Sequence, residues 1–115
     1  MVPSIGSFVT CDDAELTAEG YVLSLPGSEF AGTIVTVFAE LFSLRAGTTI
    51  RAYLVGPDGE RADFPSEELV PQNTRYLQCA FILGSVELRA GPYRMQLFVD
   101  NMLLAEKDVL LGVTS

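Results

Sequence analysis

Short apolar segments recur along the whole sequence, and each is closed by a cluster of turn-forming residues. Within several segments apolar and polar residues alternate, as expected of strands whose two faces meet different surroundings. Many short strands at regular spacing indicate an all-β protein of the sandwich or barrel type. We expect about seven strands, taken from these segments: 7–11, 20–25, 33–44, 49–55, 60–64, 75–83, 93–99 and 102–113, the last interrupted near 106–108.

The clearest turn is Gly-Pro-Asp-Gly at 56–59, where the proline presets one φ angle and the final glycine accepts a positive one. It predicts a hairpin between the flanking strands. Asp100 and Asn101 read as a two-residue hairpin connection. The acidic segment 12–17 predicts a short helical turn with an Asp N-cap. The proline-bracketed segment 65–73 predicts a surface loop.

The chain has 115 residues, of which 49% are hydrophobic, so it is long enough for one hydrophobic core and too short for two. We expect a single β-sandwich domain over residues 1–115. The formal net charge of -8 repels phosphate groups, which argues against nucleic-acid and membrane partners. No apolar run has transmembrane length and the N-terminus lacks the features of a signal peptide, so we expect a cytoplasmic location.

The sequence has no histidine, which removes the commonest general base, the Ser/His and Cys/His nucleophile pairs and the histidine-containing zinc sites. Its two cysteines, Cys11 and Cys79, do not have the spacing of a metal or redox motif. The sequence leaves open whether they form a disulfide. Lys107 is the sole lysine and has no evident partner for a catalytic pair. We therefore expect a non-enzymatic protein with no catalytic residues, no metal ligands and no cofactor.

The segment Leu88-Arg89-Ala90-Gly91-Pro92-Tyr93 precedes a strongly alternating strand. This arrangement resembles the tyrosine corner of immunoglobulin-like sandwiches, in which the hydroxyl of a Tyr opening a late strand bonds the backbone upstream. The sequence lacks the central Trp and the paired cysteines of antibody domains. The resemblance implies an antiparallel β-sandwich, immunoglobulin-like or related. A barrel built from the same strands remains open.

A wider resemblance covers most of the chain. It rests on Cys11-Asp12-Asp13, Gly20 at the start of a strand, the turn at 56–59, and Gly91-Pro92-Tyr93 followed by Leu97, Val99 and Asp100. Together these are similar to a family of small bacterial β-sandwich proteins of unknown function. The resemblance implies a fold and a bacterial source. It supplies no activity and no catalytic residues.

Acidic residues offer a competing interpretation. Asp12, Asp13 and Glu15 have the oxygen ligands that calcium prefers, but their spacing matches no EF-hand loop. The alternative function is thus a small-ligand or calcium-binding domain with its site on the loops 12–17 and 65–73. Glu40 is the only acid inside an apolar strand, and we expect it to form a cross-strand ion pair with an arginine, Arg51 or Arg75.

The strongest positive signal is an excess of large apolar residues. If Val35, Val37, Tyr93, Met95, Leu97, Val99 and Leu103 face the core, other large side chains must point away from it. Those predicted to form an exposed interface are Ile34, Phe38, Phe42 and Phe98. A monomer seldom exposes so many in one patch, so either a loop covers them or they bind a second copy or another protein. We expect a protein-interaction or assembly module that self-associates as a homo-oligomer through this surface.

Overall fold

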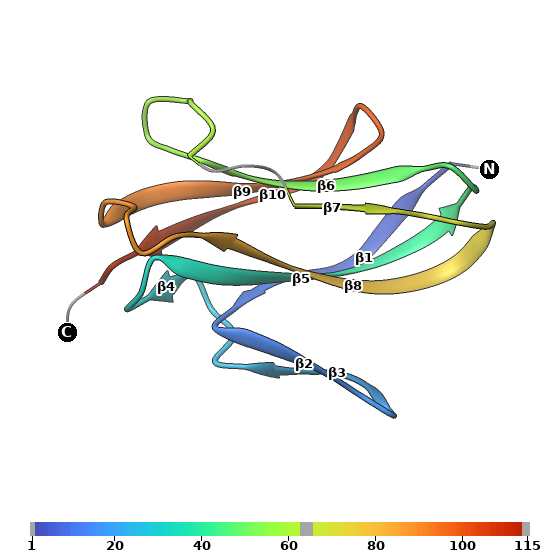
Figure 1. Ribbon diagram of the computed structural model, residues 1–115, viewed down its shortest axis with the longest axis horizontal. Coiled ribbons are helices and arrows are strands. Elements are labelled where there is room, and N and C mark those ends of the chain that lie inside the picture. The colour runs from blue at the N-terminus through green and yellow to red at the C-terminus, as the bar shows by residue number, and fades with distance from the viewer. Residues whose placement is uncertain (1, 63–65, 114–115) are drawn as a thin grey trace.

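The computed structural model describes residues 2–62 and 66–113, which contain ten β-strands and no helix (Figure 1). The strands are β1 (Ser4–Cys11), β2 (Asp13–Thr17), β3 (Gly20–Ser24), β4 (Glu29–Phe30), β5 (Ile34–Leu44), β6 (Thr49–Val55), β7 (Ser66–Leu69), β8 (Thr74–Gly84), β9 (Gly91–Val99) and β10 (Met102–Leu111). The part of the chain described here contains no helix with the length and hydrophobicity that a membrane crossing requires.

Two sheets pack face to face, so the predicted β-sandwich is confirmed (Figure 1). The three-stranded sheet has the order β1-β5-β8, and the five-stranded sheet has the order β4-β10-β9-β6-β7. Neighbouring strands are antiparallel except β4 and β10, which are parallel. A separate two-stranded unit, the β2–β3 hairpin, lies outside the sandwich, below the three-stranded sheet in Figure 1.

Alternation along the strands builds the core, because every second residue points between the sheets. The central strand β5 supplies Val35, Val37, Ala39 and Leu41, each no more than 1% exposed. From the opposite sheet β9 supplies inward residues at the same period: Tyr93, Met95, Leu97 and Val99. Each fully buried aliphatic side chain contributes about 1.5–3 kcal/mol to folding, so this pattern fixes which face of each strand turns inward.

The expectation that Leu103 faces the core is wrong. Leu103 is paired with Phe98, which points away from the core, and its side chain is 42% exposed. The register of β9 and β10 shifts between Leu103 and Ala105, and this irregularity takes the place of the break expected near 106–108. Because of such a shift, the inward and outward positions on one side of it cannot be deduced from those on the other side.

Three further differences concern short strands. The helical turn expected at 12–17 is wrong, because Asp13–Thr17 is a strand paired along its length with Gly20–Ser24. The loop expected at 65–73 contains β7, whose four residues pair with β6. The strand expected at 60–64 is reduced to one bridge between Val55 and Arg61, and its positions 63 and 64 lie outside the described residues. The first two outcomes follow from strand pairing that the local sequence does not show.

The predicted turns are confirmed. In the Gly-Pro-Asp-Gly turn the Gly59 N–H donates to the Gly56 carbonyl at 3.0 Å, and the φ of Gly59 is 84°. Asp100 adopts a φ of 53° in the connection between β9 and β10. The hydroxyl of Tyr93 donates to the carbonyl of Arg89 at 2.8 Å, which is the hydrogen bond that the tyrosine-corner resemblance implies.

The two cysteines are both free and buried, and they lie on opposite faces of the three-stranded sheet. Cys79 pairs with Ala39 and points into the core, whereas Cys11 pairs with Thr36 on the outer side. Side chains on opposite faces of one sheet point apart, so a disulfide between them is sterically excluded. Burial, with a smaller contribution from the carboxylate of Glu68, raises the pKa of the Cys79 thiol to about 12.

Candidate functional site

The outer face of the three-stranded sheet is the side that points away from the core. On β5 and β8 it carries the residues that alternate with the core positions, and four of them are large and exposed: Ile34 (43%), Phe42 (36%), Tyr76 (45%) and Ile82 (66%). Phe42 and Tyr76 are cross-strand partners with ring centroids 5.2 Å apart. This face therefore has the exposed apolar character that the sequence predicts for an interface.

The β2–β3 hairpin covers the middle of this face. Tyr21 on β3 meets Phe38 edge to face, with ring centroids 5.6 Å apart and an interplanar angle of 61°, and Phe38 is only 7% exposed. The hairpin turn reaches as far as β8, because a Cβ placed on Gly20 would lie 3.1 Å from Oε1 of Gln78. The sequence left two alternatives for the large apolar residues: cover by another part of the chain, or binding of a second copy or another protein. For Phe38, the β2–β3 hairpin of the same chain provides the cover.

Phe98 lies on the other side of the molecule. It points outward from the five-stranded sheet, where its ring meets Tyr53 edge to face with centroids 5.4 Å apart. The guanidinium of Arg61 lies 3.7 Å from the centre of the Tyr53 ring. The structure thus places Ile34, Phe38 and Phe42 on one face but does not bring Phe98 to them. The sequence gives the face of each residue but not which sheet it belongs to.

Tyr76 was not among the predicted interface residues. Its side chain adds to the outer face a hydroxyl group that forms hydrogen bonds. Its hydroxyl donates to Oε2 of Glu40 and accepts a hydrogen bond from Nε2 of Gln78 at 2.9 Å. Hydrogen bonds from Ser7 and Tyr76 lower the pKa of Glu40, and the bond to Glu40 raises the pKa of Tyr76. The alternation of side chains along β8 puts Tyr76 on the same face as Gln78. Tyr76 could have been placed beside Phe42 only if the pairing of β5 with β8 had been known.

The expected ion pair of Glu40 with Arg51 or Arg75 is wrong. Arg51 instead pairs with Glu67 across the five-stranded sheet, Nε to Oε2 at 2.9 Å. A carboxylate that acts as general acid needs a raised pKa, whereas the hydrogen bonds to Glu40 lower it. Glu40 therefore has the surroundings of a permanently ionised, hydrogen-bonded group at neutral pH.

The two acidic segments of the competing interpretation do not meet. Asp13–Thr17 forms one strand of the β2–β3 hairpin, while Ser66–Leu69 is an edge strand of the five-stranded sheet. The three-stranded sheet lies between them in Figure 1. In residues 2–62 and 66–113, no group of three or more His, Cys, Asp or Glu side chains is arranged to hold a metal ion.

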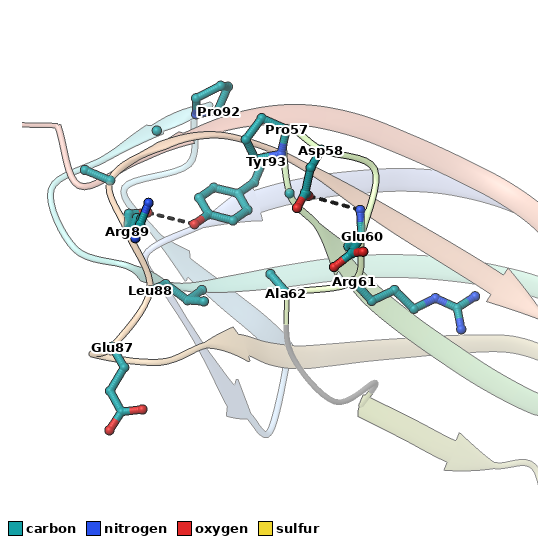
Figure 2. A pocket seen from close by; sticks show the side chains of 13 residues that line it. Pro57, Asp58, Glu60, Arg61, Ala62, Glu87, Leu88, Arg89, Pro92 and Tyr93 are labelled. Carbon is teal, nitrogen blue, oxygen red and sulfur yellow. Dashed lines mark hydrogen bonds between the residues drawn. The ribbon is translucent and has the colours of Figure 1, made fainter.

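A hollow of about 510 Å³ lies at one end of the sandwich, between the turn at 56–59 and the segment before β9 (Figure 2). Two of its polar side chains, Asp58 and Tyr93, make local hydrogen bonds. Oδ1 of Asp58 accepts from the Glu60 N–H at 3.1 Å, and the Tyr93 hydroxyl donates to Arg89. In Figure 2 the side chains of Arg61 and Glu87 extend away from the Tyr93 ring. The hollow therefore shows no convergent polar set of the kind that a ligand site requires.

Comparison with known proteins adds no family: no family model matches the chain, and no curated protein matches it either.

Proposed function

We propose that this protein is a non-enzymatic assembly module that self-associates through its three-stranded sheet. The observation that carries the proposal is the outer face of that sheet, where Ile34, Phe42, Tyr76 and Ile82 are all exposed. Burying exposed apolar groups of this size favours association by roughly 25 cal/mol for each Å² removed from water. The occupant we propose is a second copy of the chain.

Charge supports this choice of surface. Strands β1, β5 and β8 together contain only two charged residues, Glu40 and Arg75. The outer face of the five-stranded sheet carries ion pairs instead, including Arg51 with Glu67 and Arg94 with Asp108 at 2.9 Å. Two copies that each carry a net charge of -8 repel each other, and the repulsion is least where charged side chains are few.

The strand order also supports the finer fold assignment, which we propose as immunoglobulin-like. A constant-type immunoglobulin sandwich joins its first, second, fourth and fifth strands in one sheet and its third, sixth and seventh in the other. Strands β1, β5 and β8 fit the first, second and fifth, and β6, β9 and β10 fit the third, sixth and seventh. Strand β7 departs from this pattern, because it pairs with β6. The tyrosine corner at the start of β9 falls where this assignment requires it.

Light scattering across a dilution series tests the proposed function, with a charge placed on each sheet in turn. We expect the wild-type chain to be oligomeric and the variant Tyr76→Asp to be monomeric. Phe98→Asp is the matched control, because it places the same charge on the five-stranded sheet and should leave the oligomer intact. A wild-type chain that stays monomeric at every concentration, with both variants folded by circular dichroism, would refute the proposal.

A further inference from the structure

The two sheets have four edges, and three of them carry features that discourage pairing with another chain. Strand β4 is two residues long, and β7 is four residues long with adjacent acids, Glu67 and Glu68. Strand β1 has a register shift between Ile5 and Phe8 and lies against β10. Short strands, charges and irregularities are the usual means by which proteins protect sheet edges.

The fourth edge, β8, is long and carries a single charged residue, Arg75. It is eleven residues long and contains no acidic residue, and its pairs with β5 keep one register from Gly84 to Tyr76 and again at Thr74. The position skipped, Arg75, lies opposite Ser43, whose φ is 61°. Among the strands that the structure describes, only β5 pairs with it. A long, regular and largely uncharged edge strand is a template for strand addition.

The backbone groups that face outward can be assigned from one side-chain bond. The Ser66 hydroxyl donates to the carbonyl of Ile82 at 3.1 Å, so that carbonyl points away from β5. Backbone direction alternates along a strand, so the N–H and C=O groups of Thr74, Tyr76, Gln78 and Ala80 point the same way. The outward-facing stretch from 74 to 80 is symmetric about Leu77.

We propose that two copies join by antiparallel pairing of their β8 strands around a twofold axis at Leu77. This inference rests on the proposed function and specifies its geometry. The symmetric register places Thr74 opposite Ala80 of the second copy and Tyr76 opposite its Gln78. The two three-stranded sheets then form one continuous sheet across the dimer, an isologous arrangement that closes on itself.

Charge supports this register. Arg75 has no ion pair among the described residues. In the proposed dimer it lies opposite Cys79 of the second copy, on the face that points between the sheets. Strand β7, which carries Glu68, lies against β8, and the carboxylate of Glu68 contributes to the raised pKa of Cys79. The pairing therefore brings an unpaired cation of each chain towards an acid of the other, which offsets part of the repulsion between two acidic chains.

The first test removes one outward backbone donor. In Gln78→Pro the missing N–H is one that points away from β5, so the pairing within the monomer is retained. Gln78→Val is the matched control, since it changes the side chain and keeps the donor. We expect Gln78→Pro to be monomeric at concentrations where Gln78→Val and wild type are dimeric by light scattering.

The second test reports the register directly and does not depend on a proline variant folding. Opposing residues of a non-hydrogen-bonded antiparallel pair have Cα atoms about 4.5 Å apart, within the range of a disulfide. Leu77→Cys should therefore form a disulfide-linked dimer under oxidising conditions on a non-reducing gel. Gln78→Cys, one residue away and opposite Tyr76, should not link efficiently.

The outcomes separate the two proposals. If Gln78→Pro stays oligomeric while Tyr76→Asp is monomeric, the copies associate through the outer face and the edge pairing is wrong. Crosslinking at position 78 but not at 77 would also overturn the proposed register. If the wild-type chain is monomeric throughout, both the edge pairing and the proposed function fail.

Discussion

Replacing Tyr93 with Phe removes one hydroxyl and leaves the ring in the core. Tyr93 is 9% exposed, and its hydroxyl donates to the Arg89 carbonyl at 2.8 Å. A hydrogen bond of this kind contributes about 1 kcal/mol net, and leaving its partner without a donor can add to the loss, so we expect a cost of about 1–2 kcal/mol. For a domain of this size each kcal/mol corresponds to about 4 °C in the melting temperature, which gives an expected decrease of about 4–8 °C.

Urea denaturation measures the free energy of unfolding for this comparison, and Tyr21→Phe is the control. Tyr21 also packs its ring against an aromatic partner, Phe38, but its hydroxyl makes no hydrogen bond with the residues described. We expect Tyr21→Phe to change stability by less than about 0.5 kcal/mol, as surface substitutions usually do. A loss in Tyr93→Phe no greater than that in Tyr21→Phe would show that the hydrogen bond from Tyr93 to the Arg89 carbonyl does not stabilise this sandwich.

Two further changes test local geometry. Gly84→Ala should cost more than about 3 kcal/mol in the free energy of unfolding, because the φ of Gly84 is 100° and a Cβ there would lie 2.1 Å from the Thr33 carbonyl oxygen. Gly47→Ala is the control. Gly47 has a φ of 85° but open space around its Cβ position, so this change should cost only about 1–2 kcal/mol. Equal losses would contradict the steric explanation. Tyr76→Phe should raise the pKa of Glu40 towards 4.5, measured by NMR titration of its carboxyl carbon. Since the wild-type carboxyl has a lowered pKa, its contribution is present above pH 4.5 and is lost as the pH falls through the folded-state value, and the variant should lose part of that dependence.

The parts of the fold that could be predicted from the sequence are those set by local chemistry and alternation. The inward positions of β5 and β9 follow from a period of two, and the turn at 56–59 follows from its proline and glycines. Strand β2 could not be predicted in this way. Its residues are mostly polar and exposed, and they are extended only because β3 pairs with them across a turn that the Thr17 hydroxyl closes by donating to the Gly20 carbonyl at 2.6 Å.

The sequence analysis predicted two of the four exposed residues of the candidate site, Ile34 and Phe42, but not Tyr76, Ile82 or the surface that they form together. Alternation correctly turns Phe38, Phe42 and Phe98 away from the core. It carries no information on strand order, so it cannot separate the two outer faces that hold them. The cover over Phe38 depends on Tyr21, which is 17 positions earlier in the chain, and the alternation of residues 20–25 does not show that this strand lies over β5.

The position of the β2–β3 hairpin bears on how two copies can join. Face-to-face stacking of two sheets requires them to approach to about 10 Å over a broad area. The hairpin already occupies the space above Phe38, and its turn extends to the side chain of Gln78. It therefore obstructs a second flat sheet over the middle of the outer face, while Phe42 and Tyr76 stay exposed beside it. The hairpin does not pair with β8, whose edge lies in the plane of the sheet, so in-plane strand addition is open to a second copy while stacking is hindered. In a sheet extended across the dimer, the Phe42 and Tyr76 rings of both copies lie on the same side and flank the joined strands, which brings the exposed apolar groups towards one another without displacing the hairpin.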